Sequence, residues 1–597
     1  VQISPSMAAG LPRACRGQYL PVPQGSRGYN KTTMFRVSRK KQQGSELVIK
    51  RRLSTLAVVL LAMGLVMLFP RQDVAEDPQP DTAGLIRISK QTTHITGPRD
   101  EKGYVDYQAA INKEGNKGVT PANNAAVSIW QAFGRQELVP ELVPEYFRRL
   151  GMTPPPEEGE YYIDLEEFLE QEHLASGGKD TVGALSAVRE KAEEAYEKVL
   201  LGPWSPKKYP QVVRWLKRNE RTLKLAHEAS HRTHYYMPYI TESEEQEATL
   251  VMVLLPGAVH SRTMARLLVI DGFALLEKGK LQEAQDNFLA CHRLGRVCSK
   301  GGTLIEGLVG VAIDGIAIKG EMALVEHGGL SVEQLRSYQQ QLDKLPPFAS
   351  MVDKISIFER YTFLDITQQL SRRGPRVLDE LVGENGEDSS TLLESVGKGV
   401  FGALIDWNIV MEMGNKVYDR IDKIGSIKSR SEREEKFAEF EIEIKETAKH
   451  AGNAGALAQQ LLLKGKNVGQ VASEQMGSIL IALLVPSVTR AVDVPERGMM
   501  NTQMAQTAMG LSMFHKQHGR YPARLEELAP VFIKKVPTDI YSGKSIRYIQ
   551  RDDGFYLYSV GRNHQDDGGR SQDEDPAGDD MGYKVNFPSR GAPGKSE

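Results

Sequence analysis

The feature that most constrains the fold of this 597-residue chain is the spacing of its apolar residues between about residues 120 and 495. Apolar side chains recur there every three or four positions, which is the period of one face of an α-helix. The pattern is clear in the stretches AVSIWQAF, LEEFLEQEHL, AVREKAEEAYEKVLL and VVRWLKRNERTLKLAHEA. Proline-rich segments separate these stretches, because proline cannot continue a helix. We therefore expect a large, irregular α-helical domain over residues 120–495.

Three segments of this region predict particular helices. Residues 264–298 read as two helices joined by EKGK, which resembles one tetratricopeptide-like hairpin, but no copies recur at a fixed period, so a regular solenoid is not expected. Residues 304–324 are apolar but carry four charges, which favours a buried core helix over a membrane span. Residues 427–450 predict a charged amphipathic helix whose charges face solvent.

The N-terminal region predicts a membrane anchor. Residues 53–69, LSTLAVVLLAMGLVMLF, carry no charge and directly follow Lys50, Arg51 and Arg52. A bilayer is spanned by about 20 apolar residues, with a lower limit near 17. The basic flank predicts a cytoplasmic N-terminus and an exported bulk. We expect an uncleaved, single-pass signal anchor in the inner (cytoplasmic) membrane with the bulk in the periplasm; a cleaved signal peptide is the alternative.

Composition places the other boundaries. Residues 1–52 form a basic cytoplasmic leader with Met34 as an alternative start, and residues 70–119 are a polar extracytoplasmic linker. The net charge of −2 argues neither for nor against a nucleic-acid partner, but the basic leader lacks interleaved aromatic residues, so none is expected. Three cysteines do not form a disulfide framework. Cys291 and Cys298 would lie about 10 Å apart on one helix, too far to pair, and are expected to be buried.

Residues 496–589 predict a small α+β domain, followed by a tail over residues 590–597. Residues 500–516 are amphipathic, and Gly519 is a natural C-terminal end for that helix. ARLEELAP predicts a second short helix closed by Pro530. SIRYIQ and FYLYSVG are rich in aromatic and β-branched residues, and RDDG between them predicts a hairpin, because Gly554 can adopt a positive φ. An acidic, glycine-rich loop follows.

This order of elements resembles the periplasmic domain of the major pseudopilins of type II secretion systems. The residues that carry the resemblance are Gly519, Tyr521, Pro522, Leu525, Leu528, Asp539, Gly543, Tyr548, Gly554, Tyr556, Leu557, Ser559, Gly561, Gly568, Gly569, Asp579 and Asp580. The anchor lacks the glutamate of that family and stands about 430 residues from the domain, so we expect a borrowed domain on a helical protein. The whole layout also resembles large uncharacterised membrane-anchored envelope proteins of planctomycete-type bacteria.

The pseudopilin resemblance implies a calcium ion in the final loop. Its ligands would come from Asn563, Asp566, Asp567, Asp579 and Asp580. Ca²⁺ takes six to eight oxygen ligands in flexible geometry, which carboxylates and backbone carbonyls supply. Asn563 stands where the family tends to have aspartate, which would weaken the site. The alternative interpretation is a solvated acidic loop that binds no metal.

The sequence HEASH at residues 227–231 fits the zinc-peptidase pattern H-E-x-x-H. On a helix His227 and His231 would share a face and hold zinc, with Glu228 activating a water molecule. His234 follows as a further candidate ligand. However, the motif is predicted to end its helix, and an arginine follows it directly. A polar helix end with histidines near the negative end of the helix dipole is therefore the favoured interpretation.

These patterns predict a mainly α protein with an N-terminal transmembrane helix, a large irregular α-helical domain and a small α+β pseudopilin-like C-terminal domain. The expected function is a membrane-anchored, extracytoplasmic structural or interaction (scaffold) protein of the cell envelope, with protein partners there and calcium as its candidate cofactor. The alternative is a membrane-tethered zinc-dependent peptidase that uses His227, Glu228 and His231.

Overall fold

The computed structural model describes residues 86–241, 249–374, 377, 405–451, 467–485, 491–551, 554–572 and 574–586. Within these residues the chain is mainly helical, with a small three-stranded sheet near its C-terminus. Two compact units can be distinguished. The larger contains residues 106–363, 417–439 and 485–597, and the smaller contains residues 1–105, 364–416 and 440–484. The prediction of a mainly α chain with a small α+β segment agrees with this content.

The predicted fold class is wrong in its membrane-spanning part. Among the described residues, no helix is both long enough and apolar enough to cross a membrane. Helix α11 (Leu304–His327) shows why even an apolar helix fails this requirement, because Glu306, Asp314 and Glu321 lie buried along it. The segment predicted to span, residues 53–69, lies outside the described residues, as does the basic leader. The location predicted from that segment stays a prediction.

The helices of the larger unit that precede its sheet are α2 (Tyr107–Gly115), α3 (Ala125–Phe133), α4 (Val143–Leu150), α5 (Leu165–Ala175), α6 (Val182–Leu201), α7 (Pro210–Arg218), α8 (Glu220–Ser230), α9 (Pro256–Glu277), α10 (Leu281–Cys298), α11, α12 (Val332–Leu342) and α13 (Met351–Lys354). Helices α14 (Arg360–Arg373), α17 (Trp407–Gly425) and α18 (Arg430–Ala451) each contribute to both units, and α20 (Val468–Leu484) belongs to the smaller one. Helix α2 lies within the stretch predicted to be a linker.

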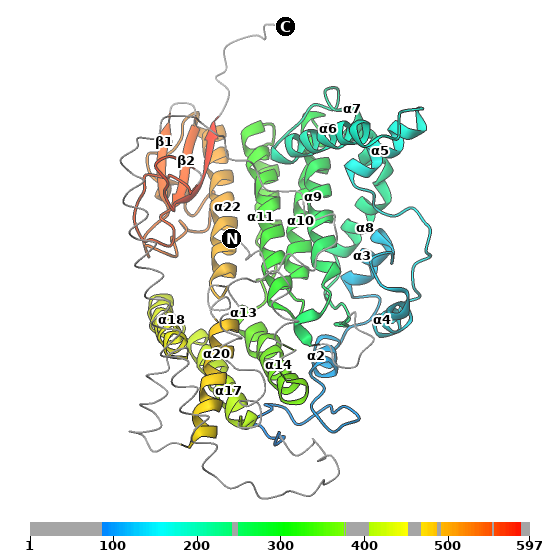
Figure 1. Ribbon diagram of the computed structural model, residues 1–597. Coiled ribbons are helices and arrows are strands. Elements are labelled where there is room, and N and C mark those ends of the chain that lie inside the picture. Colours follow the sequence, from blue (N-terminus) through cyan, green and yellow to red (C-terminus); the bar gives the residue numbers. More distant parts are fainter. Residues whose placement is uncertain are drawn as a thin grey trace, which may run out of the picture. The chain divides into compact units, whose positions relative to one another are not determined.

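Helices α9, α10 and α11 pack side by side and form the centre of the larger unit (Figure 1). The predicted hairpin of α9 and α10 and the predicted core helix α11 are confirmed. Phe288 of α10 packs against glycines on both neighbours, since a Cβ would lie 2.4 Å from its ring at Gly272 and 2.3 Å at Gly320. Cys291 and Cys298 are free and buried, as expected from their spacing.

The C-terminal segment adds helix α22 (Val494–His518) and a sheet of β1 (Arg547–Arg551), β2 (Gly554–Ser559) and β3 (Met581–Asn586). Helix α22 ends at Gly519, whose φ of 70° confirms the predicted stop. The strands are antiparallel in the order β1-β2-β3, so the predicted hairpin is confirmed, although its turn, residues 552–553, lies outside the described residues. The second helix is a short 3₁₀ turn, Leu525–Leu528.

Helix α22 lies along α11 and carries the sheet on its other side (Figure 1). Its buried residues and those of the sheet belong to the same apolar core as α9, α10 and α11. The C-terminal segment and the helical bundle are therefore packed as one unit. The loop between β2 and β3 is therefore held at both ends by strands that pack on this shared core.

Candidate functional site

The acidic loop of residues 561–580 connects β2 to its neighbour β3. Its first residue, Gly561, has a φ of 71°, and a Cβ there would lie 2.0 Å from the Asp579 carbonyl oxygen. Glycine is therefore required where the two ends of the loop meet. This contact brings the start of the loop, with Asn563, next to its end, with Asp579 and Asp580.

Three of the five predicted calcium ligands are joined by hydrogen bonds. The backbone N–H of Asn563 donates to Asp579 Oδ2 at 2.9 Å, and its side-chain amide donates to Asp567 Oδ2 at 2.9 Å. The backbone N–H of Asp579 donates to the same Asp567 oxygen at 2.9 Å. Because the hydrogen bonds to Asp567 stabilise its ionised carboxylate, they hold the pKa of Asp567 below its usual range. Asp567 and Asp579, which lie 4 and 16 positions after Asn563, are thus brought next to it.

Asp566 faces a different set of partners. Its Oδ2 lies 3.0 Å from Arg547 Nε on β1, and its Oδ1 accepts from the Tyr558 hydroxyl at 3.0 Å and from the Gly568 N–H at 3.1 Å. The arginine already supplies a positive charge to this carboxylate. Asp566 is therefore the least available of the predicted ligands.

Asp580 is the buried member of the group, with 2% of its surface exposed. Its Oδ2 accepts from the Gly569 N–H at 2.6 Å, whereas its Oδ1 has no hydrogen-bond partner among the described residues. Burial, together with the neighbouring charges of Asp567 and Asp566, raises the pKa of this carboxyl group. A buried oxygen without a donor is costly, and a cation would remove that cost.

The donor chemistry of the loop fits a hard cation such as Ca²⁺, because every candidate side chain offers oxygen. As the side chains lie, however, no three His, Cys, Asp or Glu residues within the described part of the chain are grouped closely enough to hold a metal ion. Asn563 Oδ1, Asp567 Oδ2 and both carboxylate oxygens of Asp579 accept hydrogen bonds within the loop. Asn563, Asp567, Asp579 and Asp580 are the residues that would hold the ion, and those bonds would have to be exchanged.

The structure does not bring the residues of the HEASH motif together around one cleft. His227 lines an open cleft of about 740 Å³ between α7, α8, α9 and α10. Its Nε2 lies 2.8 Å from Asn287 Oδ1, and Asn287 Nδ2 donates to Asp271 Oδ2 at 2.8 Å. Because a carboxylate only accepts, this amide orientation makes His227 Nε2 a donor. That nitrogen is therefore unavailable to a metal.

Glu228 and His231 line a second cleft of about 410 Å³ with Ala122 and Asn123. Helix α8 ends at Ser230, so His231 is its C-terminal cap, as the sequence indicated. Partial burial, with Arg293 and His227 nearby, lowers the pKa of His231. His234 Nδ1 lies 2.9 Å from the Thr233 hydroxyl. As their side chains lie in the described structure, these residues do not form a zinc site.

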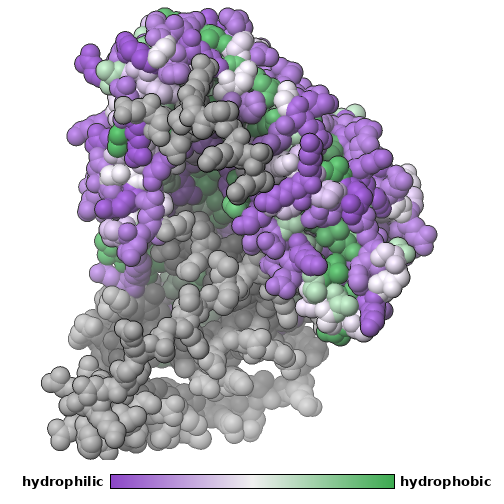
Figure 2. Space-filling view, turned by 90° about the horizontal axis from the view of Figure 1, so that it is seen from above, coloured by the Kyte–Doolittle hydropathy of each residue, from purple (hydrophilic) through white to green (hydrophobic). Residues whose placement is uncertain are grey.

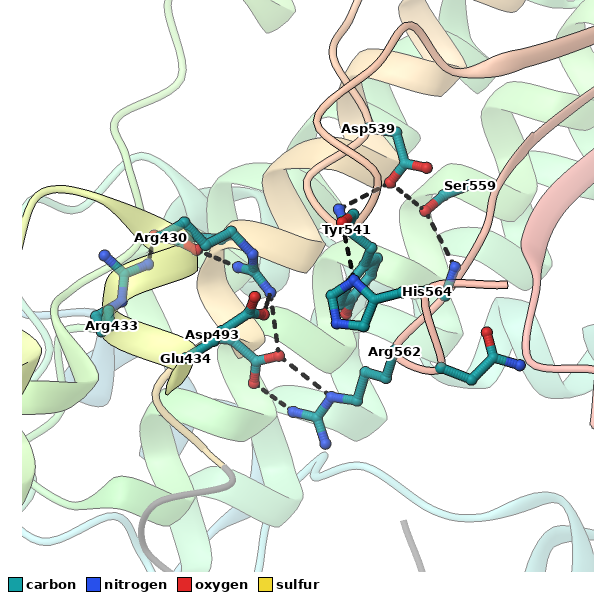
Figure 3. Close-up of polar contacts among 12 residues, drawn as sticks. Arg430, Arg433, Glu434, Asp493, Asp539, Tyr541, Ser559, Arg562 and His564 are labelled. Atoms are coloured by element: carbon teal, nitrogen blue, oxygen red, sulfur yellow. Dashed lines mark hydrogen bonds and ion pairs between the residues drawn. The ribbon is translucent and has the colours of Figure 1, made fainter. Parts of the chain in front are cut away.

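A second polar cluster fixes the loop that precedes β1 (Figure 3). Asp539 is fully buried and accepts from Tyr541 N at 3.0 Å, Ser559 Oγ at 2.8 Å, Ser542 Oγ at 2.9 Å and Val560 N at 3.1 Å. Burial raises the pKa of such a group, but these donors outweigh it and lower the pKa of Asp539. The carboxylate is satisfied without a metal, so it positions the loop rather than forming part of the calcium site.

Comparison with known proteins finds no family model, no curated protein and no solved structure that matches this chain. The resemblance to pseudopilins therefore stays a prediction based on the residues of the C-terminal segment. Sequence reasoning missed Asn287 and Asp271, which are 60 and 44 positions from His227 and belong to no motif. It also missed the burial of Asp580, for which the acidic surroundings give no local signal.

Proposed function

We propose that this protein is a non-enzymatic structural or interaction protein whose C-terminal loop binds one calcium ion. The observation that carries the proposal is Asp580, whose Oδ1 is buried without a hydrogen-bond partner among the described residues. Asp567 and Asp579 lie in the same loop and are linked through Asn563. A bound cation would stabilise this concentration of negative charge.

The face of the molecule drawn in Figure 2 suits recognition through polar contacts. Hydrophilic side chains predominate among the coloured residues in Figure 2, and hydrophobic ones gather in smaller patches. A partner on that face would be recognised mainly through polar contacts. If the domain lies outside the cytoplasm, as the resemblance implies, a weak site is sufficient, because extracellular calcium modules work at Kd values of about 0.1–1 mM.

Calcium titration of the full chain tests the proposal. A ligand that binds only the folded state stabilises it by about 2.7 kcal/mol at 100 times Kd. We therefore expect Ca²⁺ to raise the melting temperature and Mg²⁺ to raise it much less, because Mg²⁺ gives up its water reluctantly. Asp567→Asn should weaken Ca²⁺ binding about tenfold or more, since calcium affinity depends on the number of charged ligands.

Asp575→Asn is the matched control, because it removes the same charge from an exposed position of the same loop. It should leave binding nearly unchanged. If Asp575→Asn and Asp567→Asn weaken binding equally, the loop attracts calcium only through its net charge, and the assigned site is wrong.

A further inference from the structure

Arg562 and His564, the residues on either side of Asn563 in the sequence, contact residues outside the acidic loop (Figure 3). The guanidinium of Arg562 forms a two-pronged ion pair with Asp493, in which Nε donates to Oδ2 at 3.2 Å and Nη2 donates to Oδ1. On the other side, His564 Nδ1 lies 2.9 Å from the carbonyl oxygen of Tyr541. The position of Asn563, a candidate calcium ligand, therefore depends on how Asp493 and Tyr541 are held.

Both of these partners are contacted by Arg430, at the start of α18 (Figure 3). Arg430 Nη2 lies 3.6 Å from Asp493 Oδ2, and the guanidinium carbon lies 5.0 Å from the centre of the Tyr541 ring. The same guanidinium pairs with Glu434 at 2.5 Å and with Glu496. One side chain of α18 thus contacts both supports of Asn563.

These ionic contacts are only partly sheltered from water, since the side chains of Arg562 and Glu496 are 45% and 41% exposed. The exposed fraction of the side chain is 15% for Arg430, 18% for Asp493 and 10% for Arg433, which pairs with Glu496. The prediction that the charges of this helix face solvent is therefore wrong for Arg430 and Arg433. Sheltered ion pairs are screened less than surface pairs, and the loss of one member leaves its partners uncompensated.

We propose that calcium binding in the acidic loop and docking of the first turn of α18 strengthen each other through Arg562, Asp493 and Arg430. This inference rests on the proposed calcium site and assigns that site a regulatory role. Coupling between two sites is reciprocal, so an intact cluster raises calcium affinity and bound calcium holds α18 in place. Calcium binding in the loop would then stabilise the docked position of α18, a helix that lies far from the loop in the sequence.

Arg430→Gln in the full chain distinguishes this coupling from a simple charge effect. If only charge mattered, removal of a positive charge near the loop would tighten calcium binding, because it would remove a Coulomb repulsion. Coupling predicts the opposite result, a weakening of about fivefold or more, because Asp493 and Tyr541 lose their support. Lys436→Gln is the control on the same helix, since Lys436 pairs with Glu439 at 2.8 Å on the exposed side. It should leave the affinity nearly unchanged in calorimetry.

Hydrogen exchange of the wild-type chain supplies a test that needs no variant. We expect Ca²⁺ to slow exchange of the backbone amides of residues 430–439. Equal or tighter calcium binding by Arg430→Gln, or unchanged exchange in a wild-type chain that binds calcium, would overturn the coupling and leave the calcium site intact. A wild-type chain that binds no calcium overturns the site and the coupling together.

Discussion

At the scale of single residues, Asp580 distinguishes a calcium loop from an acidic turn. Its raised pKa means that the folded chain favours the protonated form, so the ionised group destabilises the calcium-free protein at neutral pH. Asp580→Asn should therefore raise the melting temperature in a chelator and lose the further rise that Ca²⁺ causes in the wild type. Calorimetric scans with and without Ca²⁺ measure both effects. If Asp580→Asn keeps the full rise in melting temperature with Ca²⁺, Asp580 is not a calcium ligand.

The same residue predicts how calcium binding depends on pH. Protons compete with the metal for carboxylate oxygens, and a raised pKa moves this competition to higher pH. On acidification, the calcium affinity of the wild type should therefore begin to fall above about pH 3.9, the usual pKa of an aspartate. Calorimetric titrations at several pH values test this prediction. An affinity that begins to fall only below that pH would show that another carboxylate controls the competition.

At the scale of elements, a buried ionic network joins α10, α11 and α22. His292 Nδ1 lies 2.8 Å from Asp314 Oδ1, and its Nε2 lies 2.9 Å from Glu321 Oε1. Thr502 of α22 donates to Asp314 Oδ2 at 3.0 Å. Burial disfavours the imidazolium, but the charges of Glu321 and Asp314 outweigh it and raise the pKa of His292 to about 10.

A raised histidine pKa contributes stability that is complete below the unfolded pKa of about 6.5 and is lost as the pH rises through about 10. His292→Gln should cost about 3–5 kcal/mol at pH 6, because it leaves the buried Glu321 carboxylate without its cationic partner, whereas Asp314 keeps Arg296 at 3.0 Å. The difference from wild type should shrink toward pH 10 in urea denaturation. His327→Gln, at an exposed position of α11, is the control. A difference that stays constant with pH would contradict the charged form of His292.

The spacing of apolar residues predicted most helices and strands but not where they are interrupted. The continuous period of residues 212–229 does not reveal that α7 and α8 separate at Asn219, whose side chain bonds both the N–H and the carbonyl of Ile163. Strand β3 was missed because Gly582 and Lys584 weaken its pattern, although pairing with β2 fixes it. The candidate acidic ligands come from the resemblance and stay a prediction. The sheltered contacts of Arg430 were not, because they depend on residues more than 60 positions away.

At the scale of the whole molecule, the C-terminal segment is part of a larger core. Met504, Ala508 and Leu511 of α22 are fully buried, and α22 packs along α11. An isolated fragment of residues 496–589 would expose this face to water, and each large side chain contributes about 1.5–3 kcal/mol when buried. We therefore expect the fragment to lack a cooperative thermal transition. A folded fragment with dispersed amide NMR signals would contradict this prediction.

The number of calcium ions bound per chain shows whether the acidic loop holds one ion. Equilibrium dialysis of the full chain against millimolar Ca²⁺, followed by atomic absorption, gives this number. We expect one ion for the wild type and for Asp575→Asn, and much less than one for the double variant Asp567→Asn with Asp580→Asn. No bound calcium in the wild type, or one ion retained by the double variant, would contradict this expectation.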